Sequence, residues 1–190
     1  MADYRFETTW RLPAGRSEAW ALLSDGEGWP TWWPSVRRVE VLTEGAPGGV
    51  DRRLRYSFST RLPYTLTFEA RMVEVVKPSR LVAAAEGELT GTWTCELAQD
   101  GEDVVVRHLW SVRTTRPWMN VVAPMAAPLF AWNHAALMRE GGRGFAAHLG
   151  TVAVVTGGPR EQRDRRRSPA FIAGAVVLAA WLVMRARRHN

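Results

Sequence analysis

An almost unbroken alternation of apolar and polar residues from 39 to 115 constrains the fold of this chain more than any other feature. A period of two places successive side chains on opposite faces of a β-strand. Clusters of Gly, Pro, Asp and Ser interrupt the alternation at 45–49, 77–79 and 100–101, where we expect turns. The pattern therefore predicts an antiparallel meander with one apolar face and one polar face.

The flanking sequence predicts the elements that cover this sheet. Residues 4–12 also alternate, which indicates a first strand, and short helical or loop segments are expected over 18–36. From Ala131 to Leu149 apolar residues recur at spacings of four and three, which predicts a long helix with one stripe against the sheet. These elements together predict an α+β domain.

Prolines and glycines within the helical region leave its course open. They are Pro117, Pro124, Pro128, Gly141, Gly142 and Gly144. The prolines predict a kinked or interrupted entry, because proline in a helix interior removes a hydrogen bond and clashes with the preceding turn. Each glycine costs about 1 kcal/mol of helix stability relative to alanine. The glycines therefore indicate a break near Glu140, a close approach of the helix to the sheet, or room for a ligand.

The charge distribution separates the chain into a neutral part and a basic part. Residues 1–150 carry 17 Arg and Lys against 17 Asp and Glu, whereas the last 40 residues carry eight Arg against Glu161 and Asp164. A neutral domain provides no field that attracts phosphates, and no nucleic-acid-binding motif is found, so we do not expect a nucleic-acid partner. The net charge of +6 arises entirely in the tail.

The sequence lacks the motifs of several large enzyme classes. It contains no Walker loop, no Gly-x-Gly-x-x-Gly, no His-Glu-x-x-His and no Gly-x-Ser-x-Gly. Cys95 is the single cysteine, which argues against a disulfide and a cysteine-based metal site. We therefore expect no cofactor and no metal.

Two segments resemble a known superfamily. Residues 132–142, Trp-Asn-His-Ala-Ala-Leu-Met-Arg-Glu-Gly-Gly, are similar to the final-helix signature of bacterial START-like proteins of the SRPBCC or polyketide cyclase superfamily. Residues 29–34, Trp-Pro-Thr-Trp-Trp-Pro, resemble their helix-to-strand segment. The resemblance covers about residues 3–150 and implies a helix-grip fold, in which a curved antiparallel sheet wraps around a long C-terminal helix and two short helices follow the first strand. It also implies a polyketide cyclase/dehydrase-like branch and a deep pocket between the sheet and the final helix.

The inward-facing residues would form the walls of that pocket. The predicted cavity residues are Trp33, Tyr56, Phe58, Leu66, Phe68, Trp93, His108, Trp110, Ala131, Ala135 and Met138. An apolar lining with a few polar groups is typical of small-molecule sites. The alternative is that these large side chains fill a closed core.

Two histidines are the candidates for chemistry. The alternation places His108 on the inward face of its strand, between Val106 and Trp110. A neutral imidazole there would orient a ligand hydroxyl or act as a general base. His134 lies near the edge of the helical stripe. No carboxylate is placed to pair with either, and both have a structural alternative as buried, satisfied side chains.

The C-terminal tail has the composition of a membrane anchor. An apolar run of 16 residues, 169–184, follows a basic stretch and precedes Arg185, Arg187 and Arg188. As a helix it would span about 24 Å against a hydrocarbon core of about 30 Å, with arginines reaching both headgroup layers. The alternatives are an interfacial or partner-binding helix and a packed or disordered tail. The excess of arginine before the run favours a cytoplasmic domain on the cell membrane.

These observations predict three parts: a cavity domain over 1–155, a basic linker over 156–168, and a transmembrane anchor over 169–190. The leading functional hypothesis is binding of an apolar small molecule, such as a lipid, a polyketide or an isoprenoid-like compound, by a domain tethered to a membrane. One alternative is a cyclase or dehydratase that uses His108, with His134 as a possible second group. The other is an interaction or assembly module whose cavity is filled.

Overall fold

The computed structural model describes residues 3–61, 64–114 and 117–159. Its elements are β1 (Asp3–Pro13), α1 (Arg16–Ser24), the 3₁₀ turn η1 (Gly26–Gly28), α2 (Trp29–Trp32), β2 (Val36–Thr43), β3 (Arg53–Ser59), β4 (Thr65–Val76), β5 (Arg80–Gly87), β6 (Leu89–Asp100), β7 (Asp103–Thr114), α3 (Pro117–His148) and β8 (Val154–Pro159). The turns predicted at 45–49 and 77–79 fall between strands, and the one predicted at 100–101 begins at the last residue of β6.

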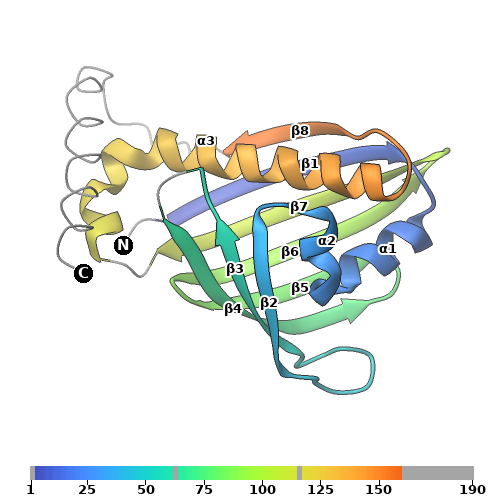
Figure 1. The fold of residues 1–190 in the computed structure, drawn as a ribbon, viewed down its shortest axis with the longest axis horizontal. Helices are drawn as coiled ribbons and strands as arrows, with labels where there is room; N and C mark the ends of the chain where they lie inside the picture. The colour runs from blue at the N-terminus through green and yellow to red at the C-terminus, as the bar shows by residue number, and fades with distance from the viewer. Residues whose placement is uncertain (1–2, 62–63, 115–116, 160–190) are drawn as a thin grey trace.

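The strands form one curved antiparallel sheet, and α3 lies across it (Figure 1). Within the described residues the order is β2-β3-β4-β5-β6-β7-β1-β8, so the meander from β2 to β7 is extended by the first strand. The short helices α1 and α2 cover the end of the sheet away from the start of α3 (Figure 1). The predicted α+β architecture with a large antiparallel sheet and a C-terminal helix is confirmed, and it is consistent with a helix-grip fold.

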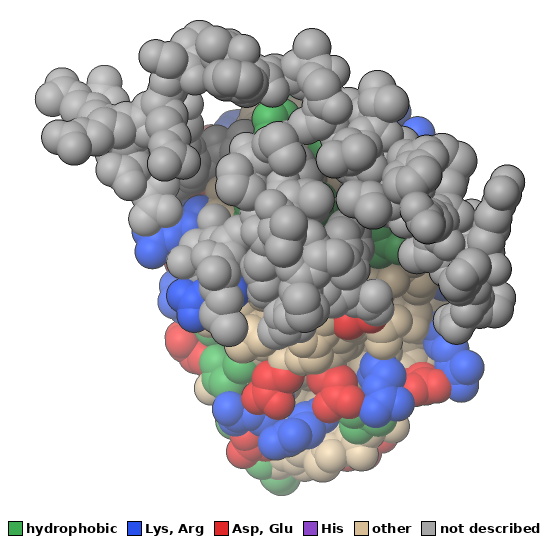
Figure 2. Space-filling view, turned by 90° about the vertical axis from the view of Figure 1, so that its left-hand side faces the viewer, with side chains coloured by type: hydrophobic (Ala, Val, Ile, Leu, Met, Phe, Trp, Pro, Cys, Tyr) green, Lys and Arg blue, Asp and Glu red, His purple; other side chains and the backbone are tan. Residues whose placement is uncertain are grey.

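The two faces of the sheet follow the alternation of the sequence. On β3, Leu54, Tyr56 and Phe58 are buried, while Arg55 between them pairs with Glu40 and Glu69 across the neighbouring strands. The part of the surface visible below the grey atoms in Figure 2 mixes acidic and basic side chains. Burial of the apolar face stabilises the sheet by about 25 cal/mol per Å², and the outer ion pairs contribute little.

Helix α3 continues through the prolines and the glycines of the sequence. In Figure 1 its first part is turned away from the axis of the rest, as prolines in a helix interior predict. A Cβ atom at Gly141 would lie 2.5 Å from the Trp33 ring, and one at Gly144 would lie 1.7 Å from the Trp32 carbonyl oxygen. The possible break near Glu140 is therefore absent, and the glycines let α3 approach the chain around α2 closely.

Strand β8 is an element that the sequence analysis did not predict. It pairs with β1 in antiparallel register from Val154 opposite Arg11 to Pro159 opposite Phe6. Its last residues fall in the stretch assigned above to the linker. A Cβ atom at Gly157 would lie 2.3 Å from the Glu7 carbonyl oxygen, so this position of the strand requires glycine.

The predicted anchor at 169–184 lies outside the described residues, as does the linker beyond Pro159. Among the residues that are described, no helix is long and apolar enough to cross a membrane. The anchor therefore stays a prediction.

Candidate functional site: an apolar pocket between the sheet and α3

Aromatic side chains fill the half of the interior next to α1 and α2. Trp29, Trp32 and Trp33 pack against one another with ring centroids 5.4 to 5.9 Å apart. Trp10 from β1 and Phe145 from α3 complete this cluster, at 5.5 Å from each other. Such pairs add about 0.5–1.5 kcal/mol each to the energy of burial. In this half of the domain, the interpretation of the inward residues as a closed core holds.

The other half of the interior contains a pocket of about 110 Å³. It lies between α3 and the ends of the strands near the start of β1. The lining residues are Tyr4, Phe6, Trp33, Phe58, Tyr64, Leu66, Phe68, Leu89, Trp110, Val112, Phe130, Asn133, His134, Leu137 and Met138. All of them except Asn133 and His134 are apolar or aromatic. An engineered cavity of about 150 Å³ binds benzene, so a pocket of this size suits a single ring.

The structure divides the predicted cavity residues among three places. Trp33, Phe58, Leu66, Phe68, Trp110 and Met138 line the pocket, together with His134. Tyr56 and Trp93, with Phe68 and Trp110, line a second space of about 20 Å³. That space has about the volume of one water molecule. His108, Ala131 and Ala135 line neither space.

Sequence reasoning missed the contributions of β1 and of part of α3. Tyr4 and Phe6 alternate with polar residues on the first strand, which was a usable signal for an inward face. On α3 the lining residues that were missed are Phe130, Asn133 and Leu137. These residues are spaced by three and four, but they lie to one side of the stripe predicted from Ala131 and Ala135. Asn133 is polar, and a pattern of apolar residues does not include it.

His108 is enclosed by the aromatic core. Its ring lies 4.2 Å from Trp10 and 6.0 Å from Trp93, measured between ring centroids, and its Nε2 has no hydrogen-bond partner among the described residues. Burial, and to a smaller extent the charge of His134, lowers the pKa of His108 to about 3. The side chain is therefore neutral at physiological pH and has no contact with the pocket, so the structure separates the first candidate for chemistry from the candidate site.

His134 and Tyr4 are the pocket-lining residues whose polar atoms lack partners. Both ring nitrogens of His134 and the hydroxyl of Tyr4 are buried without a hydrogen-bond partner among the described residues. Burial lowers the pKa of His134 to about 4 and raises the pKa of Tyr4. Both groups are therefore neutral near pH 7. Each buried polar group left unpaired costs about 1–3 kcal/mol.

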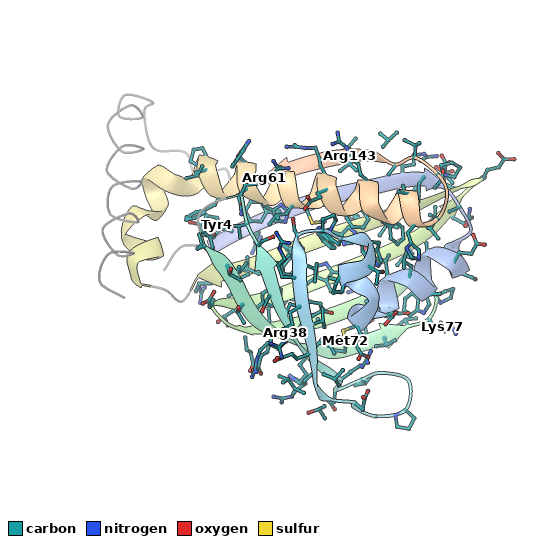
Figure 3. The ribbon with its side chains drawn as sticks, viewed as in Figure 1. Tyr4, Arg38, Arg61, Met72, Lys77 and Arg143 are labelled. Carbon is teal, nitrogen blue, oxygen red and sulfur yellow. The ribbon has the colours of Figure 1, made fainter. Side chains whose placement is uncertain are left out.

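Three hydrogen bonds fix the wall that α3 contributes. The indole Nε1 of Trp33 donates to the Leu137 carbonyl oxygen at 3.2 Å. The backbone N–H of Arg61 donates to Asn133 Oδ1 at 2.9 Å, and Ser35 Oγ donates to Glu140. In Figure 3 Arg61 is labelled at α3, and Tyr4 lies at the start of β1 below the same helix. The side-chain oxygen of Asn133 is thus already bonded within the protein.

The described residues contain no cluster of three or more His, Cys, Asp or Glu that could hold a metal ion. The lining residues also include no charged side chain. The arrangement offers shape and an almost entirely apolar surface.

The fold is shared with several solved structures. A protein from Thermus thermophilus superposes with a TM-score of 0.61 at 18% identity, covering 77% of this chain and 99% of that one. The Zhui aromatase/cyclase from a Streptomyces species superposes with a TM-score of 0.58 at 16% identity, covering 78% and 96%. A START superfamily protein from Mycobacterium smegmatis superposes with a TM-score of 0.57 at 13% identity, covering 70% and 93%. At these identities the likeness concerns the fold alone.

No curated protein matches the sequence. A family model described as polyketide cyclase / dehydrase and lipid transport matches residues 3–150, which confirms the resemblance found in the sequence. The match spans the sheet up to β7 and all of α3, including the whole pocket lining. The chain therefore belongs to this polyketide cyclase / dehydrase and lipid transport family.

Proposed function

We propose that this domain binds an apolar small molecule in the pocket between the sheet and α3. The observation that carries the proposal is a space of about 110 Å³ with apolar, mostly aromatic walls between the sheet and α3. A single ring, or the ring of a longer apolar molecule, fits this space. A larger ring system would require lining side chains to move. Burial of about 160 Å² of a ring would contribute about 4 kcal/mol, which corresponds to a Kd of about 1 mM.

The chemistry of the lining favours binding over proton transfer. An efficient general acid or base has a pKa near the working pH, whereas burial holds the pKa of His134 at about 4. No carboxylate lines the pocket among the described residues, and His108 lies in the aromatic core. The cyclase or dehydratase alternative therefore has less support than a binding role.

We expect toluene to bind the full-length protein with one saturable site, measured by calorimetry or by chemical-shift changes. The variant Val112→Phe places a ring in the pocket and should weaken toluene binding at least tenfold, because Val112 lines the space. Ser111→Phe is the matched control, since Ser111 is the preceding residue of β7, is exposed, and points to the other face. Its affinity for toluene should equal that of the unmodified protein.

Two outcomes would contradict the binding proposal. One is the absence of saturable toluene binding by the folded protein. The other is equal toluene affinity in Val112→Phe and Ser111→Phe at temperatures where both variants are folded.

We further propose that the tail, residues 160–190, attaches this domain to the cytoplasmic side of a membrane. The support is the apolar run 169–184 between arginines and the place where the tail begins. Strand β8 ends at Pro159 opposite Phe6, and Phe6 lines the pocket. The tail thus leaves the domain at the pocket end of the sheet, which would place the pocket close to a source of apolar ligands.

The full-length protein should float with vesicles of phosphatidylcholine and phosphatidylglycerol in a density gradient, and deletion of residues 160–190 should abolish flotation. Val177→Arg should reduce flotation strongly, because a charge at the centre of a membrane helix costs about 3 kcal/mol. Val177→Leu is the matched control and should float like the unmodified protein. Full-length protein that stays at the bottom of the gradient would refute the tether.

A further inference from the structure

We propose that the outward face of α3 is a docking surface for an anionic membrane. This α3 face consists of Trp132, Arg139 and Arg143, with Arg61 beside them. The inference builds on the proposed membrane attachment of the tail and adds a second contact, which the folded domain itself makes. It concerns exposed side chains on the side of the helix away from the pocket.

The spacing of the three helical residues places them on one line along α3. Arg139 and Arg143 follow Trp132 by seven and eleven residues, so at about 100° per residue the three side chains lie within about 40° of one another. The line is about 16 Å long at about 1.5 Å per residue. Trp132 is 50% exposed, and both arginines are exposed. His134 and Leu137 line the pocket and point to the other side of the helix.

The arginines of this face lack the carboxylate partners that other surface arginines have. Arg107 on the outer face of the sheet pairs with a glutamate of β1. Arg139 and Arg143 form no ion pair with a described residue. The sequence explains this difference, because Glu140 is the single acidic residue within 104–159, and its carboxylate already accepts a hydrogen bond from a buried serine. The α3 face therefore carries positive charge that the protein does not neutralise.

Arg61 adds a third positive charge beside the helix. Its backbone N–H donates to Asn133 Oδ1 at 2.9 Å, and Asn133 follows Trp132 in the sequence. The side chain of Arg61 is exposed. Figure 3 labels both Arg61 and Arg143 along α3. The positive charge thus extends over the length of the line from Trp132 to Arg143.

The end of the face that carries Trp132 lies near the start of the tail. Strand β8 ends at Pro159 opposite Phe6, and Phe6 stacks on His134 with ring centroids 4.1 Å apart. His134 is two residues from Trp132 on α3. A membrane that holds the tail would therefore meet this end of the α3 face first.

An anionic membrane is the partner that this combination of side chains fits. An exposed tryptophan suits the membrane interface, because its ring is apolar and its N–H is polar. Each arginine close to an anionic surface strengthens binding about fivefold. A second copy of the chain is disfavoured, since a symmetric contact would bring the same positive charges together. Nucleic acid is disfavoured by the zero net charge of residues 1–150.

The test asks whether the α3 face touches the bilayer in the full-length protein. A fluorophore is attached at Ala147→Cys, an exposed position one turn after Arg143, or at Thr92→Cys, an exposed position on the outer face of the sheet. Cys95 is buried, so the introduced cysteine is the accessible thiol. The vesicles contain phosphatidylcholine, phosphatidylglycerol and a lipid with a nitroxide on its headgroup. We expect at least threefold more quenching of the Ala147→Cys label than of the Thr92→Cys label.

The quenching of the Ala147→Cys label should depend on charge. Arg139→Gln with Arg143→Gln should weaken the contact about 25-fold, at about fivefold for each lost charge. Replacing phosphatidylglycerol by phosphatidylcholine should also reduce the quenching, as should 0.5 M NaCl, which screens the charges. The matched control is Arg53→Gln with Lys77→Gln, which removes the same charge from exposed positions away from α3 (Figure 3). It should keep the full quenching.

The outcomes separate the docking surface from the tether. Equal quenching of the two labels, or full quenching in Arg139→Gln with Arg143→Gln, overturns the docking surface, and flotation of the same protein leaves the tether intact. A protein that neither floats nor shows quenching overturns both. A dimer that Trp132→Ser converts to a monomer in sedimentation would assign the face to a second copy of the chain and overturn the docking surface as well.

Discussion

Replacing Gly144 with alanine should destabilise the domain by about 3 kcal/mol, although alanine is the better helix former. A Cβ atom at this position would lie 1.7 Å from the Trp32 carbonyl oxygen, and a backbone atom cannot move away cheaply. Helix α3 would therefore have to separate from α2. Helix propensity alone predicts stabilisation of about 1 kcal/mol, so the sign of the change distinguishes the two effects.

The measurement is urea unfolding of Gly144→Ala beside Gly158→Ala. Gly158 on β8 is the matched control, because nothing lies within 4 Å of a Cβ built there. We expect Gly158→Ala to stay within about 0.5 kcal/mol of the unmodified protein, as surface substitutions usually do. A Gly144→Ala protein as stable as this control would show that α3 does not pack against α2 as described.

This close contact also shows which part of the fold the sequence could predict. The alternation of apolar and polar residues predicted the strands of the sheet, because a period of two translates directly into two faces. Gly141 and Gly144 indicated three different possibilities from sequence alone. The three possibilities were a break in the helix, room for a ligand, and a close contact of the helix with its neighbours. Only the positions of Trp32 and Trp33 in the folded domain show that the close contact is the correct one.

Two other elements had weaker signals for physical reasons. Strand β8 is short and contains Gly157, Gly158 and a terminal proline, all of which lower strand propensity. Its pairing with β1 compensates for this, and pairing between distant segments cannot be derived from local propensity. The course of α3 through Pro124 and Pro128 was likewise left open, since tertiary packing can override a local preference.

The candidate site was predicted in part. Alternation placed Phe58, Leu66, Phe68 and Trp110 on the inward face, where they line the pocket. It placed His108 on the same face, and the structure encloses His108 between Trp10 and Trp93. The face of a strand therefore predicts whether a side chain points inward. It does not predict which inward side chains fill the interior and which surround the remaining space, because that depends on how the tryptophans pack.

The stability of the domain should fall by about 4 kcal/mol between pH 7 and pH 5 through His108, which is buried, and His134, whose ring nitrogens are buried. Burial lowers the pKa of His108 to about 3 and that of His134 to about 4 in the folded protein. In the unfolded chain a histidine has a pKa of about 6.5. Below pH 6.5 the unfolded state therefore binds protons that the folded state does not bind, and stability falls as the pH falls towards 4 and then 3. At pH 5 each histidine accounts for about 2 kcal/mol, at 1.36 kcal/mol per pH unit.

Urea unfolding at pH 7 and pH 5 tests this expectation in three variants. His108→Leu and His134→Leu should each remove about half of the loss, because each deletes one group that protonates only on unfolding. Val106→Ala is the matched control, since Val106 is fully buried two residues from His108 on β7 and carries no titrating group. It should lower stability by about 2 kcal/mol at both pH values and keep the full loss between them. A loss between pH 7 and pH 5 in His108→Leu as large as that in Val106→Ala would mean that His108 is reached by water or has a partner in the folded protein. The enclosure of His108 by Trp10 and Trp93, and with it the separation of this histidine from the pocket, would then be wrong.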